Sequence, residues 1–111
     1  MINFNKLWKT NNLCKKIKRE IKEIEFKDID YSKYIIIDIR GKREYKEGHL
    51  SGSINIPLFE LKRNISKYVL NKEELILVYC QSGIRSKKAA CTLEGLGYIN
   101  VYNLKGGLDN I

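Results

Sequence analysis

The sequence predicts an α/β protein with an open, mostly parallel five-stranded sheet and helices on both faces of the sheet. Segments rich in apolar and β-branched residues alternate with segments of helical period along the 111 residues, and this alternation is typical of parallel strands joined by helices. The longest apolar segments, residues 34–40 and 75–79, are continuous rather than alternating, as expected for strands that are covered on both faces. With 43% hydrophobic residues, a chain of this length is sufficient for one core, so we expect one folded domain.

Five strands and three helices are expected in chain order. The strands are placed at residues 23–26, 34–40, 53–56, 75–79 and 100–104, and the helices at residues 41–46, 58–69 and 86–95. Pro57 stops the third strand, and apolar residues at Leu58, Leu61 and Ile65 then follow a helical period. Gly95 ends the third helix.

The positive charge of the chain is concentrated at its start. Residues 1–22 carry +6 of the formal net charge of +8, so we expect a basic arm or helix at residues 1–22 and the folded domain at residues 23–111. Because the domain itself is almost balanced, its charge does not predict binding to nucleic acid. The arm fits a solvated extension or a basic amphipathic helix that contacts a membrane surface or an acidic partner, and its apolar residues suggest that it covers part of the sheet.

The sequence predicts a cytoplasmic protein without a transmembrane segment. No apolar segment approaches the roughly 20 residues that span a bilayer. The first residues lack the apolar core of a secretory signal.

The chemistry is expected at Cys80, where the apolar strand 75–79 ends. Gly83 follows in a tight turn, and a helical pattern begins beyond the turn. Backbone N–H groups of such a turn converge on one point, and the N-terminus of the helix adds partial positive charge, so a thiolate would be stabilised there. Asp38 also ends a strand, and the carboxyl ends of parallel strands share one edge of a sheet, so we expect Asp38 and Cys80 at the same rim. No Cys-x-x-Cys pair or Cys/His cluster is present, so no metal site is expected.

Two groups of residues carry a family resemblance over roughly residues 24–108. The first group is Asp38-Ile39-Arg40, Glu44-Tyr45, Gly48-His49-Leu50, Gly52-Ser53 and Asn55-Ile56-Pro57, and the second is Cys80-Gln81-Ser82-Gly83-Ile84-Arg85-Ser86 with Ala89-Ala90, Leu93, Gly97-Tyr98, Val101, Leu104 and Gly106-Gly107. In these residues the chain resembles single-domain rhodaneses, which are persulfide-forming sulfurtransferases. The chain departs from the family after the double glycine, where members commonly continue into a helix that carries a tryptophan. We therefore expect the closing helix to be missing or very short.

The resemblance implies that Cys80 takes the outer sulfur of thiosulfate or another persulfide donor, a small anion, and passes it from a Cys80 persulfide to an acceptor thiol or partner protein. It implies no organic cofactor. The residues expected to bind the substrate are Gln81, Ser82, Gly83, Ile84, Arg85 and Ser86. Asp38 and Arg40 are expected to brace the loop, Glu44 to support a helix or an ion pair, and His49 to hold its own turn rather than act as a base.

Two other functions remain open at this point. A rhodanese-type module could carry sulfur or dock a partner without turning over thiosulfate. Phosphatases and arsenate reductases that are similar in fold have a loop with the spacing Cys-x5-Arg, whereas Cys80 and Arg85 have the spacing Cys-x4-Arg. The shorter loop favours a single sulfur atom over a tetrahedral oxyanion.

Overall fold

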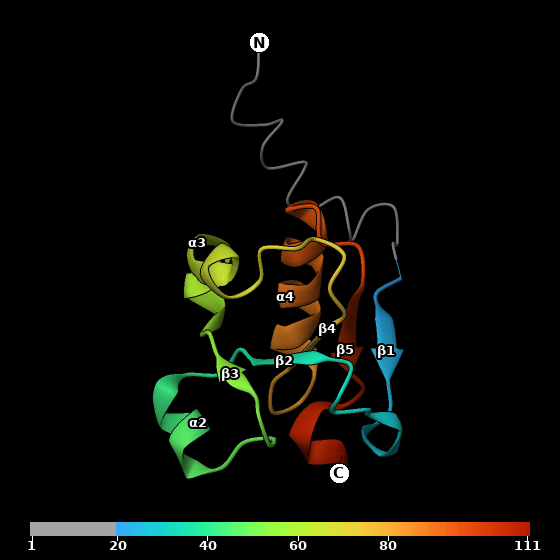
Figure 1. The fold of residues 1–111 in the computed structure, drawn as a ribbon. Coiled ribbons are helices and arrows are strands. Elements are labelled where there is room, and N and C mark those ends of the chain that lie inside the picture. Colours follow the sequence, from blue (N-terminus) through green and yellow to red (C-terminus); the bar gives the residue numbers. More distant parts are fainter. Residues whose placement is uncertain (1–19) are drawn as a thin grey trace.

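The fold was taken from a computed structural model, which describes residues 20–111. Five strands form one sheet in the order β1-β5-β4-β2-β3, and every neighbouring pair is parallel (Figure 1). The strands are β1 (Lys22–Ile24), β2 (Ile35–Asp38), β3 (Ile54–Asn55), β4 (Ile76–Tyr79) and β5 (Val101–Leu104). The predicted α/β class and the five-stranded sheet are therefore confirmed. Most of the expected arm, residues 1–19, lies outside the described residues, so the domain boundary stays a prediction.

Within residues 20–111, three α-helices and one short 3-10 helix connect the strands, and a second 3-10 helix follows β5. They are η1 (Phe26–Asp28), α2 (Lys42–Glu47), α3 (Leu58–Tyr68), α4 (Ile84–Gly95) and η2 (Gly107–Asn110). Helix α4 begins at Ile84, two residues earlier than predicted, because Gly83 adopts a left-handed conformation with φ of 92° and turns the chain directly into the helix. The last helix of the described residues is η2, a 3-10 helix of 4 residues. Among residues 20–111, no helix is long and apolar enough to cross a membrane.

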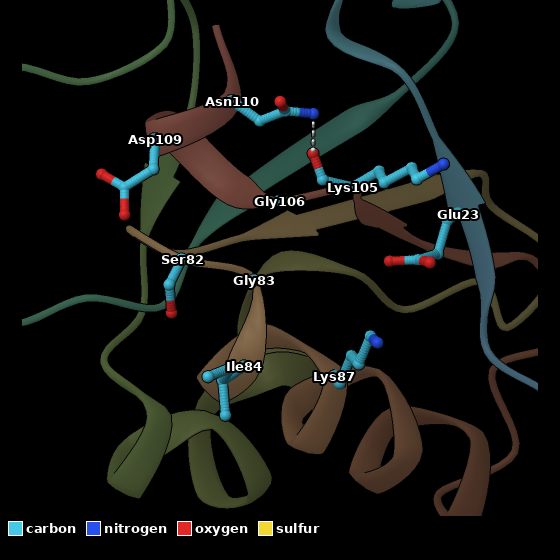
Figure 2. Close-up of a pocket in the computed structure, with 9 residues that line it drawn as sticks. All are labelled: Glu23, Ser82, Gly83, Ile84, Lys87, Lys105, Gly106, Asp109 and Asn110. Atoms are coloured by element: carbon cyan, nitrogen blue, oxygen red, sulfur yellow. Dashed lines mark hydrogen bonds between the residues drawn. The ribbon is translucent and has the colours of Figure 1, made fainter.

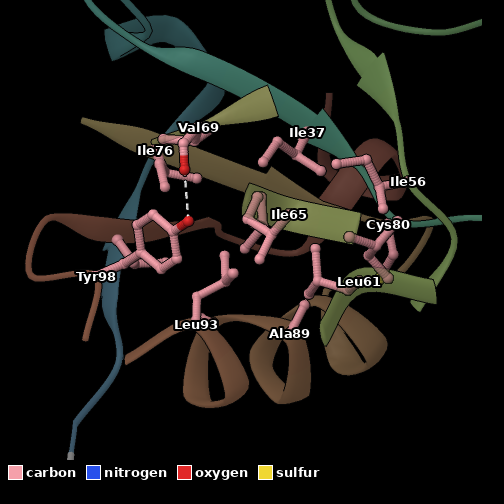
Figure 3. Packing of buried hydrophobic residues seen from close by; sticks show 14 residues of the cluster. Ile37, Ile56, Leu61, Ile65, Val69, Ile76, Cys80, Ala89, Leu93 and Tyr98 are labelled. Atoms are coloured by element: carbon pink, nitrogen blue, oxygen red, sulfur yellow. Dashed lines mark hydrogen bonds between the residues drawn. The ribbon is translucent and has the colours of Figure 1, made fainter. Parts of the chain in front are cut away.

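The two faces of the sheet are covered differently. Helices α3 and α4 cover one face, where Leu61, Leu93 and other buried side chains pack against the strands (Figure 3). On the other face, Leu77 and its buried neighbours contact Phe26 from η1 and Leu108 from η2. Helices thus lie on both faces as expected, but on the second face they are single 3-10 turns.

The chain changes direction across the sheet at the carboxyl ends of β2 and β4. After β2 the chain continues to β3 on one side, whereas after β4 it continues to β5 on the other side. Asp38 pairs in register with Tyr79, so Cys80 follows directly beside the end of β2. Ligands of open parallel sheets bind at such a switch point.

The glycine turn after β5 brings the end of the chain against the Cys80 loop. Gly106 and Gly107 have φ values of 72° and 62°, a region that other residues rarely adopt. The turn lets the Leu108 N–H donate to the Cys80 carbonyl at 3.0 Å and the Asp109 N–H donate to the Gln81 carbonyl at 2.8 Å. The two carbonyls are so close to Gly107 that a Cβ there would lie 2.6 Å and 2.5 Å from them. Only glycine fits this contact without displacing the loop.

We predict that Gly107→Ala destabilises the fold by about 2–4 kcal/mol, because it combines a left-handed backbone with a steric clash against backbone atoms. The measurement is the free energy of unfolding in urea. Gly95→Ala is the matched control, since a Cβ at the end of α4 would meet no atom within 4 Å, and its stability should be unchanged or slightly raised. Equal stability of the two variants would contradict the prediction.

Candidate active site

Cys80 lies directly after β4 and is fully buried, with 0% of its surface exposed. Its Sγ accepts a hydrogen bond from the Gly83 N–H at 3.1 Å and from the Ser86 hydroxyl at 3.4 Å. The sulfur thus faces hydrogen-bond donors of the loop and of the first turn of α4, as the sequence predicts.

The surroundings of Cys80 favour the thiolate. Burial raises the pKa of the thiol, but hydrogen bonds from the Ser86 hydroxyl and from the backbone N–H groups of Ser86, Gly83 and Ser82 outweigh this effect. The pKa of Cys80 therefore lies below its ordinary value. A thiolate, unlike a thiol, is a strong nucleophile at neutral pH.

The loop carbonyls are held away from the sulfur by hydrogen bonds on the outside of the loop. The Gln81 carbonyl accepts the Asp109 N–H, and the described peptide bonds are trans. In a trans peptide the N–H points opposite to the carbonyl, so the Ser82 N–H points inward. The Gly83 carbonyl accepts a hydrogen bond from the Asn103 amide at 3.4 Å. These bonds keep donors rather than acceptors around the sulfur.

Asn103 is a site residue that the sequence analysis missed. It is fully buried in β5, and its amide also donates to Glu23 of β1 at 3.0 Å. The sequence signal that could have identified Asn103 is a polar residue flanked by apolar ones within a predicted strand. A buried amide in a sheet needs specific hydrogen-bond partners, so such a residue is a candidate for a contact with the site.

Asp38 and Arg40 form a buried ion pair beside the loop. The Arg40 Nη2 lies 2.8 Å from the Asp38 Oδ2, and Arg40 is only 4% exposed. The Arg40 guanidinium also donates to the Gly48 carbonyl at 2.6 Å and approaches the Gln81 side chain at 3.5 Å. Gln81 donates in turn to Asp109 at 2.6 Å. The structure therefore brings Asp38 and Arg40 to the first loop residue after Cys80.

Arg85 points its two terminal nitrogens at Glu44 of α2. The two guanidinium–carboxylate distances are both 3.0 Å, and the side chains are 42% and 38% exposed. The Gly41 N–H holds the same carboxylate at 3.2 Å. The hydrogen bonds from Arg85 are the main cause that lowers the pKa of Glu44 to about 2. The guanidinium that was expected to bind the substrate therefore has a carboxylate as its partner.

Ser82 and Ile84 lie at the surface, and Ile84 is 73% exposed. They border a hollow of about 520 Å³ beside the loop, into which Lys87 reaches from α4 and Glu23 from β1 (Figure 2). His49 lies in a second hollow near Arg40. Its Nδ1 bonds the Tyr45 carbonyl at 2.8 Å and its ring stacks on Tyr45, which agrees with the expected structural role.

Comparisons with known proteins agree with the fold. Residues 18–111 match the family model described as Rhodanese-like domain. The chain is 39% identical to the uncharacterized protein YqhL of Bacillus subtilis, over 83% of this chain and 71% of that protein. It is 41% identical to the thiosulfate sulfurtransferase PspE of Escherichia coli, over 68% of this chain and 71% of that protein. A solved structure described as rhodanese with anions from E. coli is 40% identical, with a TM-score of 0.66 over 70% of this chain and 91% of that one.

We predict that the alkylation rate of Cys80 rises with pH to a plateau, with a midpoint below the value of about 8.5 of a free cysteine. Ser86→Ala removes the hydroxyl donor, so its midpoint should move upward by about one pH unit. The measurement is the rate of iodoacetamide labelling of the Cys80 peptide by mass spectrometry. Ser66→Ala, an exposed serine of α3, is the control. A midpoint unchanged in Ser86→Ala would show that the hydroxyl does not stabilise the thiolate.

Proposed function

Because the chain belongs to the rhodanese-like domain family, we propose that it is a sulfurtransferase that moves a sulfane sulfur from thiosulfate or another persulfide donor to a thiophilic acceptor through a persulfide on Cys80. The observation that carries the proposal is the pair of donors on the Cys80 Sγ, the Gly83 N–H at 3.1 Å and the Ser86 hydroxyl at 3.4 Å. Donors at that point stabilise both a thiolate and a persulfide anion.

In the first half of the reaction, the Cys80 thiolate attacks the outer sulfur of the donor. A sulfur–sulfur bond forms at Cys80 while the bond between that sulfur and the rest of the donor breaks. With thiosulfate, the electron pair of the broken bond leaves on sulfite. Gly83 supplies the left-handed turn after Cys80, and a Cβ there would lie 3.2 Å from the Gly106 backbone N.

In the second half, a nucleophilic acceptor attacks the outer sulfur of the persulfide and Cys80 departs as a thiolate. The donors that lower the pKa of Cys80 also make it a good leaving group, since both roles require a stable anion. The acceptor is a thiol or a thiol-bearing partner protein. We assign the reaction to the cytoplasm, where reducing conditions keep the Cys80 thiol available.

The remaining loop residues have supporting roles in this proposal. The side chain of Gln81 is held between Arg40 and Asp109. Its position keeps the N–H of the next residue, Ser82, directed at the sulfur. Ser82 and Ile84 are at the surface, where an incoming donor or acceptor would contact them. The buried pair of Asp38 and Arg40 supports the loop rather than reacting.

We predict that incubation with thiosulfate adds about one sulfur mass to the protein. Intact-protein mass spectrometry measures the gain, and fragmentation should locate it at Cys80. Cys80→Ser, which keeps the other two cysteines, should show no gain. Cyanide or a small thiol should then remove the added sulfur and return the original mass.

The same measurement separates the proposal from its alternatives. Repeated turnover of thiosulfate and cyanide supports an enzyme, whereas loading without turnover would indicate a sulfur carrier. Sulfur gain that persists in Cys80→Ser would remove Cys80 from the mechanism. Hydrolysis of aryl phosphates without sulfur loading would favour a cysteine-based phosphatase instead.

A further inference from the structure

Of the described residues, two arginines belong to the Cys80 loop or contact it, and each is paired with a carboxylate. Arg40 is bound by Asp38 at 2.8 Å, and Arg85 is bound by Glu44 through two contacts of 3.0 Å. The sulfur is therefore stabilised by neutral N–H and O–H dipoles rather than by an unpaired cation.

The hollow beside the loop has no excess of positive charge either. Its charged residues are Lys87, Lys105, Glu23 and Asp109, so two ammonium groups face two carboxylates. Lys105 also lies 3.5 Å from Glu25. A sulfur donor that approaches along this hollow meets equal numbers of positive and negative side chains.

We propose that Glu44 sets the donor preference of Cys80, so that the preferred donor is a monoanionic or neutral sulfane-sulfur compound, such as an organic persulfide, rather than the dianion thiosulfate. This proposal rests on the sulfurtransferase function proposed above. Arg85 directly precedes Ser86, whose hydroxyl donates to the Cys80 Sγ at 3.4 Å, so the backbone of Arg85 belongs to the turn that surrounds the sulfur. While Arg85 is paired with Glu44, the pair has no net charge that would attract a second anion.

Glu44 is suited to this role because its position and its charge are both fixed. The Gly41 N–H at the start of α2 holds the carboxylate at 3.2 Å. Its pKa of about 2 keeps it ionised at neutral pH. A dianion interacts with this charge twice as strongly as a monoanion does, and physiological salt screens only weakly those charges that lie within about 8 Å of each other.

The transfer from an organic persulfide needs no further reagent. The Cys80 thiolate attacks the outer sulfur of R–S–SH, the new bond forms at Sγ, and the sulfur–sulfur bond of the donor breaks. Its electron pair leaves as the thiolate R–S⁻, and Cys80 holds the persulfide. One anion is consumed and one is released.

Thiosulfate and methanethiosulfonate are the probes that test the proposal. Both present a sulfane sulfur on a tetrahedral sulfur, but methanethiosulfonate has a methyl group in place of one charged oxygen and is a monoanion. We measure the initial rate of sulfur gain at Cys80 by mass spectrometry with each donor. Glu44→Gln removes the charge and keeps an oxygen for the Gly41 N–H. Glu73→Gln is the control, because Glu73 is exposed and precedes β4, at the end of the strand opposite to Cys80.

Glu44→Gln should raise the ratio of the thiosulfate rate to the methanethiosulfonate rate by about threefold to tenfold, and Glu73→Gln should leave it unchanged. The thiosulfate rate should fall more steeply with increasing salt in Glu44→Gln than in the unmodified chain. An unchanged ratio in Glu44→Gln, or the same salt dependence in both chains, would overturn the role of Glu44. Absence of loading by either donor in every variant would instead overturn the sulfurtransferase proposal.

Discussion

The site depends on the orientation of the peptide groups that surround one buried sulfur. A thiolate in an apolar core is costly unless donors surround it, and every peptide group offers an acceptor as well as a donor. In this chain the Cys80 and Gln81 carbonyls bind N–H groups of the C-terminal turn, and the Gly83 carbonyl binds Asn103. With the acceptors occupied outside, the N–H groups remain for the sulfur.

The parallel sheet explains why these partners can meet. The carboxyl ends of β2, β4 and β5 lie at one edge of the sheet, so the segments that follow them are neighbours in space. The segment after β2 supplies Arg40, the segment after β4 supplies the loop, and the turn after β5 supplies Asp109. Three short connections thus build one site on a rigid support.

The local pattern of the sequence was sufficient to predict the sheet and the position of Cys80 at the end of a strand. Continuous apolar residues predicted the strands that became β2 and β4, and the strand ends placed Asp38 and Cys80 at one rim. The pattern did not reveal that Arg85 binds Glu44, which is 41 residues away, or that Asn103 binds the Gly83 carbonyl. Such pairs depend on tertiary distances, to which periodicity is insensitive. The early start of α4 was missed because the left-handed conformation of Gly83 is a backbone property, and several backbone conformations are compatible with glycine.

The contact between the glycine turn and the loop also has a consequence for protein synthesis. Asp109 follows its partner Gln81 by 28 residues, so a ribosome makes Cys80 well before it makes the groups that orient the surrounding peptides. Until then the Cys80 and Gln81 carbonyls lack the N–H partners that they have in the folded chain. The arrangement of peptide groups around the sulfur is therefore complete only when the last strand has joined the sheet.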